Sequence, residues 1–175
     1  MKKIPYSLLL ILFSTNVKSQ QKETGWPSFN QKEYTVKYPA DWQLDKSGQS
    51  GTSFVLFSPL ENKADLFKEN VNLLVQDLTG KNIDLTKYTE ISEGQINTMM
   101  PNSKIIESTT IKNKSIPYHK IIYTGDQGQF HLKFEQYYWV VKNKAWILTF
   151  TSEAIKFLQY KEEAEKIMNS FTLAK

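Results

Sequence analysis

The sequence predicts an α+β protein, an α/β/α layered sandwich around a central, mostly antiparallel sheet of six to seven strands. Three observations support this fold class. The chain from residue 104 to residue 152 is almost entirely typical of strands joined by short turns. Within it, the segment 129–141 becomes apolar on both faces toward its end, as in strands that are covered on both sides. Two segments with helical periodicity can supply those covers, one on each face.

Seven segments are expected to be strands, because they are rich in β-branched and aromatic residues and end at turn-forming residues. They are 33–38, 53–58, 70–78, 104–112, 115–124, 129–141 and 145–151. Turns at Asn113-Lys114, Gly125–Gly128 and Asn143-Lys144 join the last four. Short turns of this kind favour consecutive antiparallel hairpins.

Two helices are expected. Asp84 can cap the first, because a short acidic side chain accepts hydrogen bonds from the free amides of the first turn, and Pro101 ends it. The second is expected to begin at Ser152 and Glu153. Its apolar stripe includes Phe157, Ala164 and Phe171 with a period near that of a helix.

The N-terminus has the three parts of a secretory signal peptide. Lys2 and Lys3 precede a short apolar run, and Val17 and Ser19 stand at the positions that a signal peptidase reads. We therefore predict three parts in the chain: a signal peptide at 1–19, a flexible lead at 20–32 and a single domain at 33–175. The mature protein is then expected to be exported to the periplasm or the extracellular space, with no transmembrane anchor after cleavage, because the apolar run is too short to span a bilayer.

Composition excludes several function classes. The predicted signal peptide holds three lysines and no acidic residue, so its removal lowers the formal charge from +4 to +1 and removes the case for nucleic-acid binding. All 22 basic residues are Lys, so no Arg is available for bidentate phosphate recognition. The chain has no Cys, which excludes thiol catalysis and a lipid anchor at the cleavage site. We predict neither a metal nor a cofactor.

Several short motifs follow one another along the chain in a characteristic order. They are Tyr34–Trp42 (YTVKYPADW), Phe57–Pro59, Asn70–Leu73, a helix, a Tyr-rich meander, Ala145–Thr151 and Asn169–Phe171. This order resembles the PsbP-like superfamily, which includes DcrB-like bacterial envelope proteins, over residues 33–173. The resemblance implies the α/β/α layers expected above and a mostly non-enzymatic protein. Plant members are extrinsic photosystem subunits, but nothing in this sequence marks a photosystem role.

His119 and His131 are the only histidines, and both lie on neighbouring predicted strands. A four-residue loop at Gly125–Gly128 would put His119 opposite Phe134 and His131 opposite Ile122. Because side chains alternate along a strand, the two histidines would then point to opposite faces, unless a bulge or an odd loop length intervened. We therefore expect isolated structural or surface histidines.

Aromatic residues crowd the predicted meander. Tyr and Trp side chains suit recognition surfaces, because they offer apolar area with a polar tip. Tyr137, Tyr138 and Tyr118 are the candidate binding patch, and the alternative is that these rings pack beneath the helices.

Two functions from different classes remain open. The first is an exported, non-catalytic binding or assembly module of the bacterial cell envelope, whose partner is an envelope protein or a small ligand. The second is a hydrolase that uses one His as general base. The hydrolase requires that one histidine has an acidic or hydroxyl partner inside a cleft, whereas the binding module has no such requirement.

Overall fold

The structure, a computed structural model, describes residues 25–174. In chain order its elements are β1 (Ser28–Asn30), β2 (Tyr34–Lys37), β3 (Gln43–Asp45), the 3₁₀ turn η1 (Gln49–Gly51), β4 (Thr52–Phe57), β5 (Asn70–Asp77), α1 (Leu85–Met99), β6 (Lys104–Ile111), β7 (Tyr118–Gln127), β8 (Phe130–Val141), β9 (Lys144–Glu153), α2 (Phe157–Ser170) and β10 (Thr172–Leu173). The predicted signal peptide at 1–19 lies outside the described residues.

A seven-stranded sheet in the order β3-β4-β5-β9-β8-β7-β6 forms the centre of the domain. All of its strand pairs are antiparallel, and β6 to β9 follow one another as hairpins, as the sequence predicts. The predicted first strand lies elsewhere, and the seventh place is taken by the short edge strand β3, which was not predicted. The α+β fold class and the strand number are confirmed.

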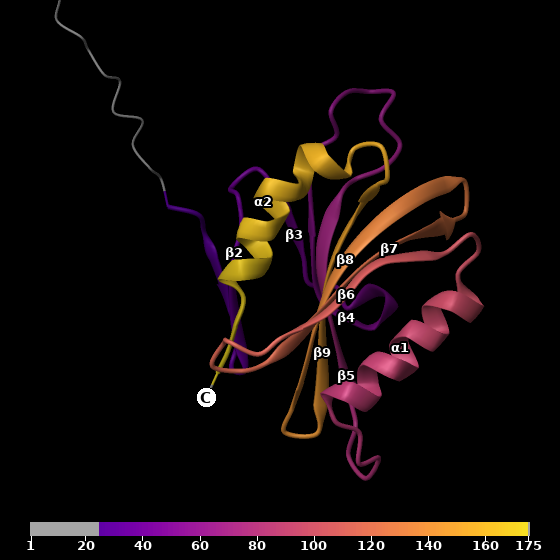
Figure 1. Ribbon diagram of the computed structural model, residues 1–175. Coiled ribbons are helices and arrows are strands. Elements are labelled where there is room, and N and C mark those ends of the chain that lie inside the picture. The colour runs from indigo at the N-terminus through magenta and orange to yellow at the C-terminus, as the bar shows by residue number, and fades with distance from the viewer. Residues whose placement is uncertain (1–24, 175) are drawn as a thin grey trace, which may run out of the picture.

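The two helices cover opposite faces of this sheet (Figure 1). On the α2 face, Phe157, Ala164 and Ile167 of the helix join a core that contains Trp146 and Phe150 of β9. On the α1 face a second core surrounds Tyr88 and Ile96 of the helix, with Tyr123, Phe134 and Tyr138 from the sheet. The predicted three layers are therefore present.

The long strand β8 shows why both covers are needed. Leu132, Phe134 and Tyr138 belong to the core on the α1 face, whereas Tyr137 and Trp139 belong to the core on the α2 face. Alternate side chains of a strand point to opposite faces, so a strand that is apolar on both sides requires a layer on each side.

A second, three-stranded sheet in the order β1-β2-β10 differs from the sequence expectation. Ser28–Asn30 pairs with β2, although these residues fall within the lead predicted at 20–32. Phe29 packs edge-on against Tyr34 and Phe54, with ring centroids at 6.1 and 5.8 Å. Partial burial of this aromatic ring fixes the described part of the lead against the domain, which the polar residues around it did not indicate.

The helix boundaries agree with the sequence at α1 and differ at α2. Asp84 caps α1, and its carboxylate accepts a hydrogen bond of 2.8 Å from the backbone amide of Lys87. The predicted start of α2 at Ser152 and Glu153 is wrong, because both residues extend β9 through pairs with β8. The helix begins only at Phe157.

Two hairpin turns are shifted from their predicted positions. β7 continues to Gln127, so the turn lies at Gly128-Gln129 rather than at Gly125–Gly128. The β8–β9 turn lies at Lys142-Asn143, where both residues have positive φ angles, 52° and 57°. Two positive φ angles are typical of the tight turns whose twist matches a hairpin. The shifted β7–β8 turn preserves the predicted assignment of the two histidines to opposite faces.

In the part of the chain that the structure describes, neither helix is long and apolar enough to cross a membrane.

Candidate functional site

An open groove lies on the α1 face of the large sheet, beside the area that α1 covers. Its volume is about 890 Å³. Strands β4, β5, β9 and β8 form its floor, and η1 and the β7–β8 hairpin contribute to its rim. We call this site the sheet groove. Its lining consists of Gln49, Ser50, Thr52, Val55, Phe57, Phe67, Asn70, Asn72, Leu74, Tyr123, Gln127, Gly128, Gln129, Phe130, Leu132, Phe134, Gln136, Ile147, Thr149 and Thr151.

The floor of the sheet groove is polar because strand register brings amide and hydroxyl side chains together. Asn72 pairs with Thr149, and Thr149 pairs with Gln136, so these three side chains form one row across β5, β9 and β8. Asn70 and Thr151 are paired in the adjacent row. These rows bring five neutral hydrogen-bonding side chains into contact across the strands. Asn70, Asn72 and Gln136 are half-buried, whereas Thr149 and Thr151 are buried, each 6% exposed.

Hydrogen bonds within the floor hold these side chains in place and leave part of their capacity free. The Gln136 amide donates to Thr149 Oγ1 at 3.1 Å, and the Asn72 amide donates to Asn70 Oδ1 at 3.2 Å. Each side-chain amide has two N–H donors and a carbonyl with two lone pairs. Donors and acceptors therefore remain available to a molecule in the groove.

Aromatic rings border this floor. Tyr123 and Phe134 stack with their ring centroids 4.7 Å apart, and both are buried. Phe67 and Phe130 contact each other at 5.1 Å and are half-buried. Burial raises the pKa of Tyr123, so its hydroxyl is neutral and available as a hydrogen-bond donor at neutral pH.

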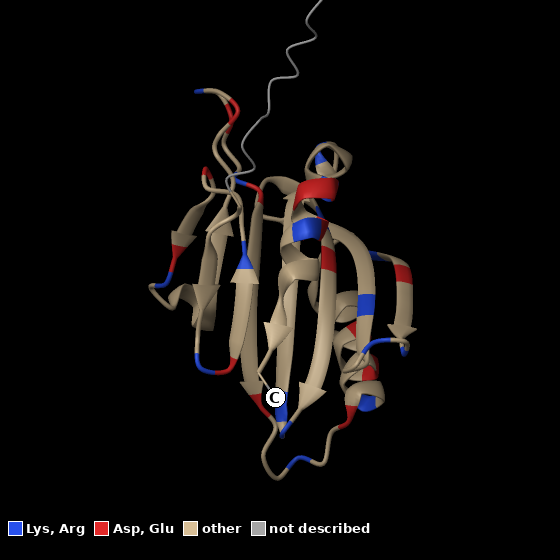
Figure 2. Cartoon of the chain, turned by 90° about the vertical axis from the view of Figure 1, so that its left-hand side faces the viewer, with Lys and Arg blue, Asp and Glu red and all other residues tan. Residues whose placement is uncertain are grey.

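The lining carries no charge. Among the residues that the structure describes, those that line the groove include no Lys, Asp, Glu or His, although charged residues make up 23% of the chain. Two strands of the floor contribute to this: β5 and β9 have charged residues only at their ends. Most of the sheet is tan in Figure 2, the colour of residues other than Lys, Arg, Asp and Glu. The groove therefore offers neutral hydrogen bonds and aromatic surface, but no ion pair.

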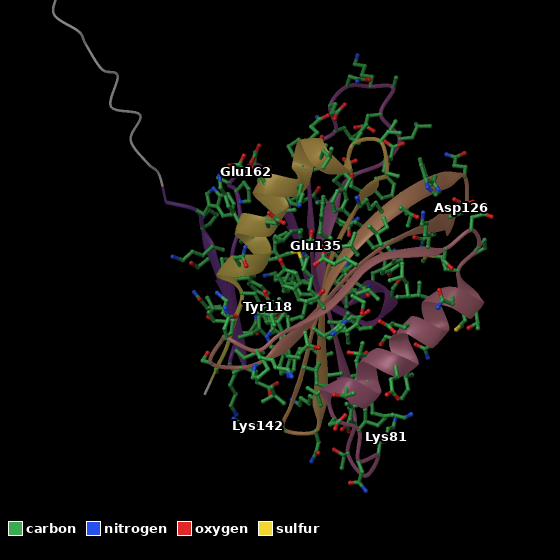
Figure 3. The ribbon with its side chains drawn as sticks, viewed as in Figure 1. Lys81, Tyr118, Asp126, Glu135, Lys142 and Glu162 are labelled. Atoms are coloured by element: carbon green, nitrogen blue, oxygen red, sulfur yellow. The ribbon has the colours of Figure 1, made fainter. Side chains whose placement is uncertain are left out.

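The structure separates the three predicted binding residues. Tyr118 and Tyr137 lie together on the α2 face, with ring centroids 4.9 Å apart, whereas Tyr138 lies on the α1 face. Tyr137 and Tyr138 are 5% and 2% exposed, so neither presents its ring to solvent. Tyr118 is half-buried, and Figure 3 shows it on the α2 side of the sheet.

Tyr118 and Tyr137 line a second pocket, of about 360 Å³, which we call the aromatic pocket. Trp139 and Phe171 complete its aromatic wall, and the Tyr118 and Trp139 ring centroids are 5.4 Å apart. The pocket is formed by the β6–β7 loop, β7, β8, the last turn of α2 and the chain that follows it. The binding role predicted for these tyrosines stays a prediction.

Tyr138 has a different relation to the candidate site. Its hydroxyl donates a hydrogen bond to the side-chain oxygen of Gln136, which is part of the groove floor. Its ring packs edge-on against Tyr88 of α1, with centroids 5.5 Å apart. Tyr138 therefore orients a groove residue from beneath α1 and does not itself line the groove.

His119 is buried and has two hydroxyl partners. Its Nε2 lies 2.8 Å from Ser108 Oγ and its Nδ1 lies 2.9 Å from Thr110 Oγ1. The Ser108 hydroxyl donates to Glu93 on α1, so it accepts from His119, and Nδ1 is left to accept from Thr110. Burial lowers the pKa of His119. The neutral ring thus joins β7 to β6, Ser108 continues the chain of hydrogen bonds to α1, and His119 lines neither the sheet groove nor the aromatic pocket.

His131 is exposed and lies near the β7–β8 hairpin, where its Nδ1 is 2.6 Å from a carboxylate oxygen of Asp126. Figure 3 shows Asp126 at the end of the sheet away from Tyr118. The predicted pairings of the histidines were wrong, because β7 is longer than expected: His119 pairs with Tyr138, and His131 pairs with Asp126. The prediction that they point to opposite faces is confirmed.

A buried carboxylate lies on the α2 face, apart from the sheet groove. Glu135 is 0% exposed, and Lys120 Nζ is 3.5 Å from its Oε1. The Tyr137 hydroxyl donates to the same oxygen at 3.1 Å, whereas Oε2 has no hydrogen-bond partner among the described residues. Burial raises the pKa of Glu135. Residues 25–174 contain no cluster of three or more His, Asp or Glu side chains that could hold a metal ion.

Comparison with known proteins decides the family. A family model described as PsbP-like protein matches residues 12–173. The chain belongs to the PsbP-like family. The match includes all the strands and both helices of the domain, so the resemblance that the sequence motifs indicate is confirmed. No curated protein matches the sequence.

Solved structures share this PsbP-like fold. LpqN of Mycobacterium tuberculosis, described as involved in cell envelope biogenesis, has a TM-score of 0.66 and 13% identity over 81% of this chain and 83% of that chain. PA94 of Pseudomonas aeruginosa, a protein of unknown function, has a TM-score of 0.62 and 12% identity over 86% of this chain and 98% of that chain. Cyanobacterial PsbP (CyanoP) of Synechocystis sp. PCC 6803 has a TM-score of 0.59 and 13% identity over 85% of this chain and 92% of that chain. At these identities the likeness establishes the fold.

The sequence analysis missed the polar floor of the sheet groove. A signal for it was present: Gln136 interrupts the otherwise apolar face that Phe134 and Tyr138 share, and Thr149 interrupts a similar face of β9. Polar side chains on a covered face require partners, so such interruptions indicate a polar site. Their convergence could not be predicted, because it depends on the register of three strands.

Proposed function

We propose that this PsbP-like protein is an exported, non-catalytic binding or assembly module of the bacterial cell envelope, and that it holds its ligand in the sheet groove. The observation that carries the proposal is the volume of about 890 Å³ lined by neutral polar and aromatic side chains. Ligand pockets typically have volumes of about 300–1,000 Å³ with a few convergent polar groups. The strand pairs of the floor fix those groups in position.

The envelope location is supported by two independent features. The N-terminal sequence is typical of a secretory signal peptide. The structurally similar LpqN is described as involved in cell envelope biogenesis. The partner is an envelope protein or a small ligand, and the small charge of the exported form argues against nucleic acid.

The non-catalytic part of the proposal is supported by the chemistry of the groove. General acid–base catalysis requires a group that titrates near the working pH, within hydrogen-bond reach of the substrate. Among the described residues of the lining, Tyr123 is the one with a titratable side chain, and burial raises its pKa. His119 has two hydroxyl partners, but it is buried and lines neither the sheet groove nor the aromatic pocket, which argues against the hydrolase alternative.

Capture from the native envelope tests the proposal. The bait is the exported form, and the groove variant combines Asn72→Leu with Thr149→Val, two changes that remove polar groups and keep the number and branching of the side-chain heavy atoms. The matched control combines Asn97→Leu on α1 with Thr109→Val on β6, both at exposed positions outside the groove. We expect one envelope component to be captured by the parent and by the control and to be lost with the groove variant. Equal capture by all three proteins would overturn the proposal.

A further inference from the structure

We propose that the sheet groove recognises a neutral oligosaccharide. This inference rests on the proposed function, because it names the ligand class of the same site. A sugar ring has hydroxyl groups around its edge and apolar C–H groups on its faces. Its recognition therefore calls for amide and hydroxyl partners beside aromatic rings, and the groove combines these two kinds of side chain.

The hydrogen-bonding pattern of the floor fits hydroxyl groups. Asn70, Asn72 and Gln136 each have both donors and acceptors, and so do the hydroxyls of Thr149 and Thr151. A sugar hydroxyl also donates and accepts, so it can pair with any of these groups in either direction. The 3.1 Å bond from Gln136 to Thr149 fixes two neighbouring floor groups relative to each other. The site is thus partly ordered before a ligand arrives, which lowers the entropic cost of binding.

The aromatic rings provide apolar contacts for the C–H faces of a sugar ring. Phe67 and Phe130 are half-buried and contact each other at 5.1 Å, so part of each ring remains accessible at one end of the groove. Phe57 is also half-buried and pairs with Asn70 across β4 and β5. An aromatic face beside an amide matches a sugar ring that presents C–H groups and hydroxyls to the same wall.

The absence of charge in the lining argues against anionic ligands. Phosphates, nucleic acids and acidic lipids are bound by Lys and Arg side chains or by helix N-termini. Of the described residues that form the groove, none is basic, and all belong to strands, loops or the 3₁₀ turn η1. A neutral ligand satisfies this site without leaving a buried charge unpaired.

Two other neutral ligands fit less well. A hydrocarbon chain would cover the half-buried amides of Asn70, Asn72 and Gln136 without replacing their hydrogen bonds to water, which is unfavourable. An extended peptide gains most of its affinity by pairing with an exposed sheet edge. The floor strands β4, β5, β9 and β8 each have a hydrogen-bonded neighbour on both sides, so none of them is an edge strand of the sheet.

The test is a titration of the ¹⁵N-labelled protein with soluble neutral oligosaccharides, monitored by amide chemical shifts. The probes are maltoheptaose, cellohexaose, xylohexaose and chitohexaose, with inorganic phosphate and vesicles of phosphatidylglycerol as anionic comparisons. We expect at least one oligosaccharide to shift amides in β4, β5, β8 and β9. We expect the groove variant Asn72→Leu/Thr149→Val to weaken its binding by about tenfold or more, and the control Asn97→Leu/Thr109→Val to change it by less than about twofold. The single change Thr149→Val provides the same comparison if the double variant does not fold.

The outcomes separate this inference from the proposed function. If no oligosaccharide shifts the groove amides, while capture from the envelope still depends on Asn72 and Thr149, the groove binds another class of molecule and the inference is overturned. Binding of an oligosaccharide outside the groove, with equal affinity for the parent and the groove variant, would overturn it as well. If capture does not depend on the groove, the proposed function itself fails.

Discussion

The side-chain amide of Gln136 on β8 donates a hydrogen bond of 3.1 Å to the hydroxyl of Thr149 on β9. The carbonyl end of the same amide accepts a hydrogen bond from Tyr138, two residues further along β8. Gln136 therefore joins the floor of the sheet groove to a tyrosine that packs under α1. A residue at the candidate site is in this way fixed by the core of the domain.

This connection predicts non-additive effects on stability. Gln136→Leu removes the acceptor of the Tyr138 hydroxyl, and a buried hydroxyl without a partner costs about 1–3 kcal/mol. Adding Tyr138→Phe removes the unpaired hydroxyl, so the double variant should recover most of the loss. Urea unfolding of the parent, the two single variants and the double variant measures the coupling. Additive losses would mean that the Tyr138 hydroxyl does not depend on Gln136.

The core on the α2 face predicts a large effect at Trp146. This residue is 4% exposed and its ring centroid lies 6.0 Å from that of Tyr34. Trp146→Ala should lower the free energy of unfolding by about 3–5 kcal/mol, the usual cost of truncating a buried aromatic residue. The half-buried Trp26 provides the control, and Trp26→Ala should cost clearly less. A change below about 0.5 kcal/mol at Trp146 would be typical of a surface residue and would contradict its burial.

The buried carboxylate of Glu135 predicts a pH dependence with a definite sign. Burial raises its pKa in the folded state, and the ammonium of Lys120 at 3.5 Å offsets part of this effect. Between the unfolded pKa of about 4.3 and the raised folded pKa, the folded protein binds more protons, so this group's contribution to stability falls as pH rises. Glu135→Gln cannot titrate there. Unfolding measured at several pH values from about 4 to 7 should therefore show the variant gaining stability relative to the parent as pH rises. A relative loss over that range would show that Lys120 lowers the pKa of Glu135 in the folded protein.

The two histidines are expected to be dispensable for binding. His119 is engaged by Ser108 and Thr110, and His131 lies near the β7–β8 hairpin with Asp126. The double variant His119→Ala/His131→Ala should capture the same envelope component as the parent. Its fold is checked by circular dichroism, because His119 is buried and hydrogen-bonded to two residues of β6. If the folded double variant loses function while groove variants retain it, an active site around His119 becomes the better account.

Export gives a separate prediction. The sequence at 1–19 places small or apolar residues, Val17 and Ser19, at the positions that precede a signal-peptidase cut. N-terminal sequencing of the protein recovered outside the cytoplasm should therefore begin at Gln20. A recovered protein that retains the apolar run at 8–13 would contradict cleavage.

Much of the fold could be predicted from local patterns. Asp84 and Pro101 bound α1 because capping and helix termination depend on neighbouring residues. The alternation along 129–141 identified the two covered faces, since it depends only on the period of a strand. The strand β1 could not be predicted from its polar sequence, because it is stabilised by contacts of Phe29 with residues far along the chain.

Less of the candidate site than of the fold could be predicted from the sequence. Tyr137 and Tyr138 are adjacent in sequence and were expected to share a patch, but successive strand residues point to opposite faces, and each ring is buried in a different core. The groove floor depends on Asn72, Thr149 and Gln136 meeting across three strands. That register is set by turn positions and by tertiary packing, which single residue types do not reveal.

The most direct measurement for the proposed function is an amide chemical-shift map of the ¹⁵N-labelled protein on addition of the envelope component that it captures. We predict that the largest shifts fall on β4, β5, β8 and β9 around Asn72, Thr149 and Gln136, and that Thr149→Val weakens binding while Thr109→Val does not. Shifts confined to the aromatic pocket around Tyr118 and Phe171, with full binding by the groove variants, would contradict the assignment of the sheet groove as the binding site.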